Sequence, residues 1–372
     1  MPSDFFTCCE KLLRYSKFER KRICTMNYQL LGRSGLRVSD LCLGTMSFGE
    51  DWGWGSPKDE AKKIYDAFRE AGGNFLDTAN VYTQGTSERF VSEFISGHRE
   101  EIVLATKYTN AMPGRDPNAG GNQRKNMVQA VEASLKRLGT DYIDLYWLHI
   151  WDQITPAEEV MRAFDDLVRA GKLLYVGISD APAWVVAKSN TLAELRGWTR
   201  YVGLQIEYSL LERTVERELI PVARDQQMTV LAWSPLRSGL LTGKYLPENT
   251  GAETSEARLN NEMMKGFLSQ DDTSTRTVRE VVAISKELGV SPAQVALAWL
   301  RYRPAPVIPI IGARKLSQFE DNLRSLDIDL SPELVQRLDT ASAISLGFPQ
   351  DFFTIDMVRT FTFGGLRERI KA

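Results

Sequence analysis

The sequence predicts an α/β fold, a closed (β/α)8 TIM barrel with an N-terminal β-hairpin and long loops at the carboxyl ends of its strands. Two observations carry this prediction. Short apolar runs alternate with amphipathic stretches of helical period along most of the chain, which is typical of parallel strands covered by helices. Eight such units follow one another without a domain-sized break, which favours a closed barrel over an open doubly wound sheet.

The expected strands begin with the hairpin, in which Tyr28–Leu31 and Leu36–Val38 are joined by a turn at Gly32–Gly35. Eight apolar runs then follow as barrel strands. These runs are Leu41–Met46, Asn74–Ala79, Ile102–Lys107, Tyr142–His149, Leu173–Ser179, Tyr201–Tyr208, Thr229–Leu236 and Val307–Gly312.

The expected helices lie between these strands and carry apolar residues at helical spacing. They include Pro57–Ala71, Glu88–Ser96, Gln123–Leu138, Pro156–Ala170 and Glu216–Gln226. Local signals support their ends, because Thr155 precedes a proline at a first helical position and Gly139 and Gly171 follow helix ends. Ser291-Pro292 opens a further helix that runs to about Arg301.

The chain divides into three parts. We expect residues 1–25, which mix apolar and charged side chains, to be a poorly ordered N-terminal extension. Residues 26–345 form the barrel, and residues 346–372 form a C-terminal tail rich in phenylalanine that we expect to fold over the active-site face. Two long segments after strands, Tyr108–Asn122 and Leu246–Thr273, are expected at the same face, where barrel enzymes place their chemistry.

Composition excludes several classes of function. The formal net charge is −2, so the whole chain offers no field that would attract nucleic acid or an acidic membrane. No apolar run approaches the ~20 residues that span a bilayer, and no signal or transit peptide is recognisable. The four cysteines and two histidines lack metal-ligand spacing, so no metal site is expected. We therefore expect a cytoplasmic protein with a small-molecule partner.

Reactive side chains follow three successive strands. Asp77 ends the second strand and Tyr82 follows one short loop later, Lys107 ends the third strand, and His149 ends the fourth. Strand ends share one mouth of a barrel, so these groups should meet. A cationic Lys107 would lower the pKa of the Tyr82 phenol, and Asp77 would balance the buried charge. With His149 orienting an oxygen, the set predicts general acid catalysis on a carbonyl and base catalysis on an alcohol.

Each residue also has an ordinary structural explanation. An Asp–Lys pair is often a structural ion pair, a tyrosine near a strand end usually packs, and His149 could be a satisfied core histidine. Their appearance in order on three successive strands favours the catalytic interpretation. Two other functions stay open: a redox-sensing NADP(H)-binding partner protein with little turnover, and an aldolase that uses Lys107 as a Schiff-base amine.

Motifs along the chain resemble the aldo-keto reductase family from about Tyr28 to Leu326. The similarity is closest to the family's aryl-alcohol dehydrogenase-like and potassium-channel β-subunit-like branches. The matching motifs are Leu43-Gly44-Thr45-Met46, Phe75-Leu76-Asp77-Thr78-Ala79 with Tyr82, Lys107, Tyr142-Ile143-Asp144-Leu145 with His149, Gly177-Ile178-Ser179, Gln205-Ile206-Glu207-Tyr208-Ser209, Trp233-Ser234-Pro235-Leu236 and Pro309-Ile310-Ile311-Gly312-Ala313.

The resemblance implies a catalytic tetrad of Asp77, Tyr82, Lys107 and His149, with Tyr82 as the proton donor. It also implies an extended NADP(H) bound without a glycine-rich fingerprint. The residues it places near the nicotinamide are Thr45, Met46, Asp77, Ser179, Asp180, Gln205 and Trp233. Those it places near the pyrophosphate are Ser234, Leu236, Gly239 and Lys244, and those near the adenosine are Gly312, Arg314, Gln318, Asp321 and Asn322.

Two details qualify this cofactor site. Arg314, with Lys315 and Arg258, could hold a 2′-phosphate by charge-assisted hydrogen bonds, which favours NADP over NAD. The family commonly has an asparagine where this chain has Asp180, and a carboxylate cannot donate to the carboxamide oxygen. We expect Trp52, Trp54 and Tyr108 to line the substrate pocket. The predicted function is thus an NADP(H)-dependent oxidoreductase that interconverts aldehydes or ketones and alcohols, with Tyr82 as general acid/base.

Overall fold

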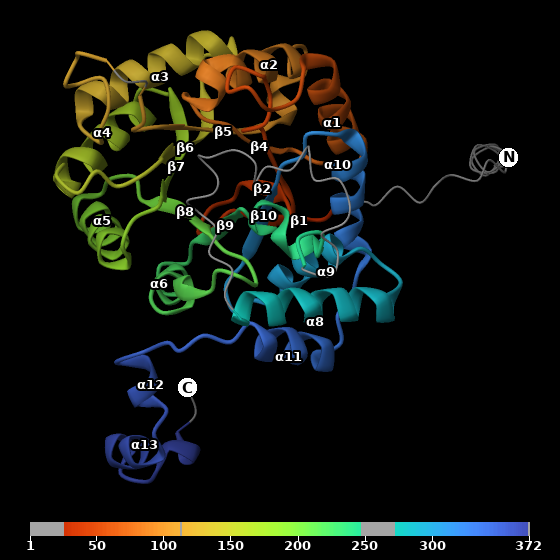
Figure 1. The fold of residues 1–372 in the computed structure, drawn as a ribbon. Helices are drawn as coiled ribbons and strands as arrows, with labels where there is room; N and C mark the ends of the chain where they lie inside the picture. Colours follow the sequence, from red (N-terminus) through yellow and green to blue (C-terminus); the bar gives the residue numbers. More distant parts are fainter. Residues whose placement is uncertain (1–25, 112–113, 247–271, 371–372) are drawn as a thin grey trace, which may run out of the picture.

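Eight parallel strands close into a barrel in the order β10-β3-β4-β5-β6-β7-β8-β9, which confirms the predicted fold. The computed structural model describes residues 26–111, 114–246 and 272–370. Figure 1 shows the helices forming a ring around the strands. The barrel strands are β3 (Cys42–Gly44), β4 (Phe75–Asp77), β5 (Val103–Tyr108), β6 (Ile143–Leu148), β7 (Leu173–Ser179), β8 (Tyr201–Glu207), β9 (Thr229–Trp233) and β10 (Val307–Ile311).

The ring helices bury apolar side chains at helical spacing, as Val160, Phe164 and Leu167 show on α4. Ser291 caps α9 as predicted, since its Oγ accepts a hydrogen bond from Gln294 N at 3.2 Å. The helices are α1 (Lys58–Glu70), α2 (Thr86–Phe94), α3 (Arg124–Leu138), α4 (Ala157–Arg169), α5 (Ala183–Arg196), α6 (Leu219–Asp225), α8 (Asp272–Leu288), α9 (Pro292–Trp299), α10 (Leu316–Leu323) and α11 (Pro332–Ala341), followed by the short α12 (Gln350–Phe353) and α13 (Asp356–Phe363). The 3-10 turns are η2 (Tyr82–Gly85), η3 (Arg99–Glu101), η4 (Thr214–Glu216), η5 (Arg237–Thr242), η8 (Leu300–Tyr302), η9 (Arg324–Asp327) and η10 (Arg367–Arg369).

Several bounds differ from the prediction. β3 and β4 end at Gly44 and Asp77, two residues earlier than expected, because the chain turns there into the loops of the site. The helix expected from Glu216 begins only at Leu219, since η4 occupies the preceding residues.

The N-terminal hairpin closes the amino end of the barrel. Its strands β1 (Tyr28–Leu30) and β2 (Arg37–Ser39) pair antiparallel. Leu31 and Val38 belong to the same buried cluster as the side chains that fill the barrel interior. The backbone N–H of Gly32 donates to the Oγ1 of Thr229, the first residue of β9, at 2.7 Å. A site for chemistry therefore has to lie at the opposite, carboxyl ends of the strands.

The barrel interior is filled around one large side chain. Trp147 of β6 is fully buried, and Gly177 and Gly203 on β7 and β8 leave room for its ring. A Cβ at Gly177 would come 2.3 Å from the Trp147 ring, and one at Gly203 would come 2.8 Å from it. Both glycines are thus required by packing, because even a methyl group would overlap the indole.

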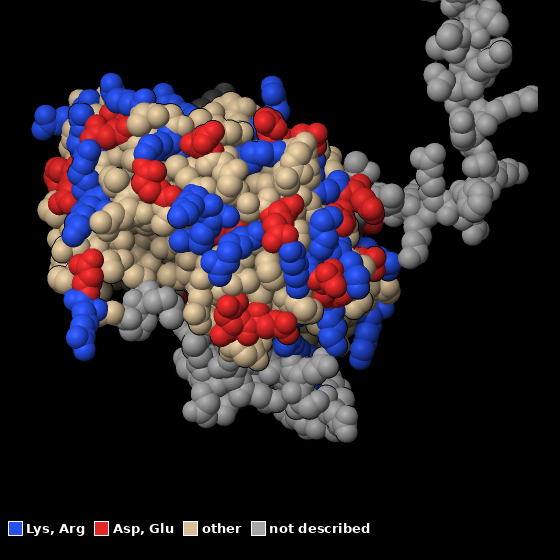
Figure 2. Space-filling model, turned by 90° about the horizontal axis from the view of Figure 1, so that it is seen from above, with Lys and Arg blue, Asp and Glu red and all other residues tan. Residues whose placement is uncertain are grey.

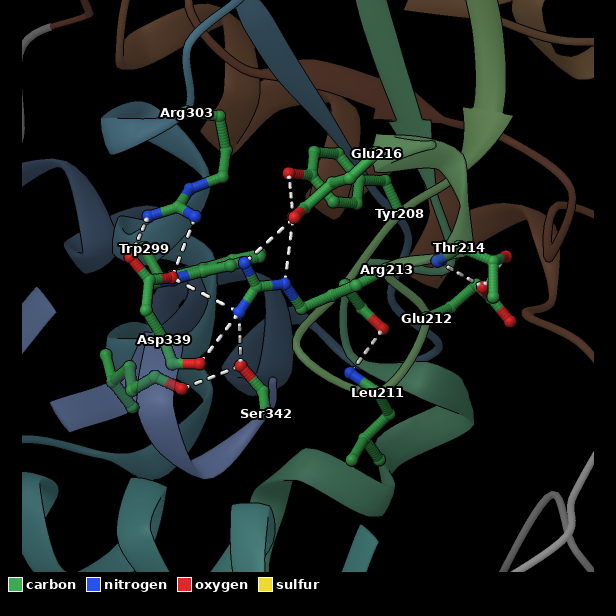
Figure 3. Close-up of polar contacts among 12 residues, drawn as sticks. Tyr208, Leu211, Glu212, Arg213, Thr214, Glu216, Trp299, Arg303, Asp339 and Ser342 are labelled. Carbon is green, nitrogen blue, oxygen red and sulfur yellow. Dashed lines mark hydrogen bonds and ion pairs between the residues drawn. The ribbon is translucent and has the colours of Figure 1, made fainter. Parts of the chain in front are cut away.

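A polar cluster fastens the loop after β8 to the helices of the C-terminal third (Figure 3). Arg213 donates from Nε and Nη2 to the Glu216 carboxylate at 2.8 and 2.9 Å, and its Nη1 donates to Ser342 Oγ at 2.8 Å. Asp339 on α11 accepts from Trp299 Nε1 at 2.9 Å and from Arg303 Nη1 at 2.8 Å. These bonds join the loop after β8 to α9 and α11, so they connect the middle of the chain to its C-terminal third.

The C-terminal tail lies outside the ring of helices. Figure 1 shows α12 and α13 beyond α6 and α11, away from the centre of the barrel. The contacts that fix it run to the start of α6: Gln350 Nε2 donates to Arg217 O at 2.8 Å and to Glu218 Oε1 at 2.6 Å. The described part of the tail thus stands beside the barrel, where we expected it to cover the active-site face. The physical reason is that its root is held by these polar bonds at the periphery.

Positive and negative side chains are interspersed on the surface, as Figure 2 shows for one face. Among residues 26–111, 114–246 and 272–370, no single helix is long and apolar enough to cross a membrane. Only α8 together with Pro292–Tyr302, bent by 105°, passes that test by length and composition. In the same residues, no group of three or more His, Cys, Asp or Glu side chains could hold a metal ion.

Candidate active site

Four predicted side chains meet at the carboxyl ends of β4, β5 and β6. Lys107 is fully buried, and its Nζ donates to the Asp77 carboxylate, to Thr78 O at 2.8 Å and to the Tyr82 hydroxyl at 3.0 Å. The Tyr82 ring stands edge-on to the His149 ring, with centroids 5.9 Å apart and an interplanar angle of 82°. The structure therefore brings an acid, an ammonium, a phenol and an imidazole into one cluster.

Strand register explains why Asp77 and Lys107 meet. Asp77 of β4 pairs with Ala105 of β5, and Lys107 lies two residues further on, so its side chain points to the same inner side. Thr45, directly after β3, holds the backbone at Asp77, because its N–H and its hydroxyl both donate to the main-chain carbonyl oxygen of Asp77, at 2.9 and 3.1 Å. The carboxylate itself accepts hydrogen bonds from Lys107 Nζ and from Gln205 Nε2.

Tyr82 is held by a turn that L-residues rarely adopt. Thr83 and Gln84 have φ values of 45° and 55°, in the left-handed region, which carries a cost of about 1–3 kcal/mol per residue. The Thr83 hydroxyl offsets part of that cost, since it donates to Phe48 O at 2.7 Å and accepts from Ser87 N at 3.1 Å. The turn carries the Tyr82 hydroxyl to within hydrogen-bonding distance of Lys107.

Burial and charge set the protonation states. Burial lowers the pKa of Lys107, but the Asp77 carboxylate and the Tyr82 phenol more than offset it and raise that pKa to about 12. Burial lowers the pKa of His149 to about 3, and the Lys107 charge acts in the same direction. At neutral pH the lysine is therefore cationic and the imidazole is neutral.

The pKa of Tyr82 differs from the expectation. We predicted that Lys107 would lower it, and the lysine charge does act in that direction. Burial is the larger effect, however, and it raises the pKa of the phenol above its usual value of 10. Without a bound ligand, Tyr82 is therefore protonated at neutral pH and can donate that proton. The Lys107 ammonium beside it stabilises the phenolate that the donation would leave.

Residues expected around a nicotinamide lie at the ends of β7, β8 and β9. Gln205 Nε2 donates to Asp77 Oδ1 at 3.0 Å, so its other amide atom remains for a ligand. Trp233 Nε1 donates to Asp180 Oδ1 at 3.0 Å. Burial raises the pKa of Asp180 to about 6, with the Trp233 bond and the Lys107 charge opposing it. The Ser179 hydroxyl is buried near the Asp180 carboxyl, and no hydrogen bond of normal geometry satisfies it among the described residues, so it can bond a ligand.

Residues expected around the pyrophosphate follow β9. Ser234, Arg237, Ser238 and Gly239 all have positive φ values, from 46° to 89°. Successive turns of this kind direct backbone N–H groups into a concavity that suits anions. Gly239 lies beside Lys244, since a Cβ at Gly239 would be at ordinary contact distance, 3.4 Å, from the lysine ammonium. Leu236, in the same segment, is half-buried.

The residues expected around the adenosine differ in whether their side chains are accessible to a ligand. Gly312 is exposed and Arg314 half-exposed, next to Gln318, whose Oε1 accepts from Arg314 N at 3.1 Å. The Asp321 carboxylate already accepts from Ser291 Oγ at 2.7 Å and from Gln294 Nε2 at 2.6 Å, so it serves the N-terminus of α9.

Three further expectations concern the rim of the site. Asn322 is buried, Met46 is half-buried next to Thr45, and Arg258 lies outside the described residues. Trp52 stands edge-on to Tyr82 with centroids 6.4 Å apart, and the Trp54 ring lies 5.7 Å from that of Trp52, so both tryptophans stand on the Tyr82 side of the site.

Tyr108 does not line the pocket. It is fully buried in the layer between strands and helices, where its ring stacks on Tyr146 with centroids 5.5 Å apart. Alternation along β5 explains this correction, because Lys107 points inward and its neighbour must point outward.

Two asparagines near His149 were missed. Asn110 Nδ2 lies 3.2 Å from His149 Nδ1, and Asn80 Nδ2 donates to Asn110 O at 3.1 Å. Single asparagines in loops follow no pattern of spacing, so nothing in the sequence distinguished them from turn residues.

Comparison with known proteins gives consistent matches. The sequence model of the Aldo/keto reductase family matches residues 40–343. An aryl-alcohol dehydrogenase [NADP(+)] of Phanerodontia chrysosporium is 37% identical over 346 residues, which cover 87% of this chain and 88% of that one. A norsolorinic acid reductase of Emericella nidulans is 38% identical over 86% of this chain and 82% of its own. An uncharacterized oxidoreductase of Bacillus subtilis is 40% identical over 84% of this chain and 95% of its own.

Proposed function

This chain belongs to the aldo/keto reductase family, and on that premise we propose that it is an NADP(H)-dependent oxidoreductase interconverting aldehydes or ketones and alcohols. Family membership makes it an oxidoreductase that acts on small molecules. The finer assignment rests on one observation above the others. The Lys107 ammonium bonds both the Asp77 carboxylate and the Tyr82 hydroxyl, which is an arrangement for moving a proton at the phenol oxygen.

Tyr82 acts as the general acid in reduction. Its Oη donates a proton to the carbonyl oxygen of the substrate, and the negative charge left on Oη is stabilised by Lys107 at 3.0 Å. Asp77 keeps Lys107 protonated, so the ammonium stays in place through the transfer. Solvent then restores the proton on Tyr82. In alcohol oxidation the same groups act in reverse, with the phenolate as the base.

When bound, NADPH would supply the hydride for the carbonyl carbon, and this chain's residues would hold its nicotinamide. The residues present fit such a group. The buried, unsatisfied Ser179 hydroxyl and the free amide atom of Gln205 suit a carboxamide, and the positive-φ segment beside Lys244 suits a pyrophosphate. Arg314, with Lys315 and Arg258, would favour a 2′-phosphate. The NADP(+) in the name of one relative agrees with this preference.

The aldolase alternative is disfavoured. A Schiff-base lysine has to lose its proton to attack a carbonyl, and the pKa of Lys107 is raised to about 12. Sodium borohydride would trap a Schiff base on Lys107, and we expect no such adduct.

A substrate panel tests the proposal. Oxidation of NADPH and of NADH is followed in parallel with aromatic and aliphatic aldehydes, ketones and the corresponding alcohols. We expect turnover with NADPH well above that with NADH. Tight NADPH binding with complete inertness towards every carbonyl would overturn the enzymatic assignment and favour a redox-sensing role. Equal rates with both nucleotides would overturn the NADP preference alone.

A further inference from the structure

One contact between the loop after β5 and the end of β6 has no assigned role. Asn110 Nδ2 lies 3.2 Å from His149 Nδ1, on the side of the imidazole away from its Nε2. We propose that Asn110 is a positioning residue that holds His149 in the tautomer with its proton on Nε2. The proposal rests on the proposed function, because that tautomer is useful only where an oxygen has to be oriented beside Tyr82.

The backbone that carries Asn110 is strained. Thr109 has a φ of 92°, in a region that β-branched residues almost never occupy, and such strain costs about 1–3 kcal/mol. Thr109 is also buried, so its neighbours can hold it there. The Asn122 amide donates to Thr109 Oγ1 at 2.9 Å, and Gly121 N donates to Thr109 O at 2.9 Å. This strain turns the chain at the end of β5 so that Asn110 faces His149.

A hydrogen bond from the loop after β4 also fixes the backbone of Asn110. Asn80, in the loop between Asp77 and Tyr82, donates from Nδ2 to Asn110 O at 3.1 Å. The Asn110 backbone is therefore fixed both by the loop after β4 and by the Thr109 turn. Its side chain is left to interact with the imidazole at the end of β6. This is the arrangement of a residue that sets the orientation of its neighbour.

Because the His149 imidazole is neutral, its contact with Asn110 can determine which ring nitrogen carries the proton. Burial and the Lys107 charge lower the pKa of His149 to about 3, so the ring carries a single proton at neutral pH. A neutral imidazole donates from one nitrogen and accepts at the other. When the amide N–H of Asn110 donates to Nδ1, that atom is the acceptor, and the proton stays on Nε2. The Nε2–H can then donate to the same substrate oxygen that receives the Tyr82 proton.

The chain itself provides a reference for the experiment. It has only two histidines, and the second, His98, lies in the segment between α2 and η3. The Nε2 of His98 contacts the Oη of Tyr65, on α1, at 2.5 Å. Two-bond ¹H–¹⁵N correlation spectra of the ¹⁵N-histidine-labelled full chain will therefore contain two imidazoles, which His98→Gln assigns. The spectra report directly which nitrogen of each ring is protonated.

The wild-type spectrum already tests the proposal. We expect His149 to be neutral from pH 6 to pH 8 with Nε2 protonated and Nδ1 bare. Asn110→Asp replaces the amide with an acceptor of the same shape, so we expect the proton to move to Nδ1 or the ring to become cationic. Asn110→Ala should give a mixture of tautomers. Asn118→Asp makes the same chemical change in the same loop, at an exposed residue, and should leave the spectrum unchanged.

Kinetics give the second readout. Loss of an oriented donor should lower kcat/KM for carbonyl reduction by about 10²-fold in Asn110→Asp, with the Kd of NADPH within about threefold of wild type. A wild-type His149 with its proton on Nδ1, or an unchanged tautomer in both Asn110→Asp and Asn110→Ala, would overturn the proposal. If the wild type reduces no carbonyl but the His149 tautomer still changes with the residue at position 110, the proposed function is refuted and the role of Asn110 is not.

Discussion

The Nζ of Lys107 and the hydroxyl of Tyr82 lie 3.0 Å apart, in a cluster where the lysine is fully buried. Lys107 also bonds the Asp77 carboxylate, which balances the lysine's positive charge. The Tyr82 phenol therefore does not have to lose its proton to neutralise the lysine. The phenol therefore keeps its proton until a substrate oxygen accepts it, and the ammonium is already placed to stabilise what remains. This relationship connects the fold, the protonation states and the proposed reaction.

Removing the ammonium should cost both stability and turnover. In Lys107→Met the buried Asp77 carboxylate loses its partner, and we expect the free energy of unfolding to fall by about 3–5 kcal/mol. The rate of carbonyl reduction should fall by about 10²-fold or more. Urea denaturation and steady-state kinetics measure the two effects. The double variant Asp77→Asn/Lys107→Met should recover much of the stability and none of the rate. Recovered rate would contradict the role of Lys107.

Asp180 should make stability depend on pH. Its pKa is raised to about 6 in the folded state, above the ordinary value of 3.8. As pH rises, Asp180 loses its proton at a lower pH in the unfolded chain than in the folded one. Its contribution to the free energy of unfolding therefore falls between about pH 4 and pH 6. We expect Asp180→Asn to be more stable than wild type at pH 7.5 by about 1–3 kcal/mol. Near pH 4 the two should be similar, and an equal gain at both pH values would contradict this cause.

His149 should be silent in pH–rate profiles. Its pKa is lowered to about 3 because burial and Lys107 disfavour the imidazolium. Any step in the profile of kcat/KM for reduction between pH 5 and 8 should therefore come from another group, such as Asp180 with its pKa of about 6, and not from His149. A step there that disappears in His149→Gln, but persists in His98→Gln, would show that the imidazole does titrate.

The cluster of Figure 3 should affect stability alone. Asp339 accepts hydrogen bonds from Trp299 and Arg303, and it lies at 3.4 Å from Arg213. Asp339→Ala removes the carboxylate that accepts from Trp299 Nε1 and Arg303 Nη1. We therefore expect the free energy of unfolding to fall by about 1–3 kcal/mol. The kcat of the folded enzyme should stay within about twofold of wild type. A large loss of kcat with unchanged stability would show that this cluster reaches the site.

Much of the fold and the core of the site could be predicted from sequence. Apolar strands ending in single reactive residues indicated a barrel and placed Asp77, Lys107 and His149 at one mouth, because parallel strand ends share an edge. The same alternation shows that Tyr108 faces outward once Lys107 faces inward. That signal was present in the sequence, although the pocket expectation did not use it.

Other features depend on tertiary contacts that leave no local pattern. The balance between burial and charge at Tyr82 depends on how deeply the phenol lies, which spacing does not encode. Asp321 accepts hydrogen bonds from Ser291 and Gln294, which are 30 and 27 residues away in the chain. Asn110 reaches His149 only through a strained turn at Thr109. Both contacts join loops or helix ends, where sequence constrains geometry least.

The most direct test of the account is single-turnover reduction of an aromatic aldehyde by Tyr82→Phe saturated with NADPH. This variant removes one oxygen atom and keeps the ring between Trp52 and His149. We predict a Kd for NADPH within a few-fold of wild type and a rate of aldehyde reduction lower by about 10²–10⁴-fold. A rate close to that of wild type would contradict the assignment of Tyr82 as the proton donor.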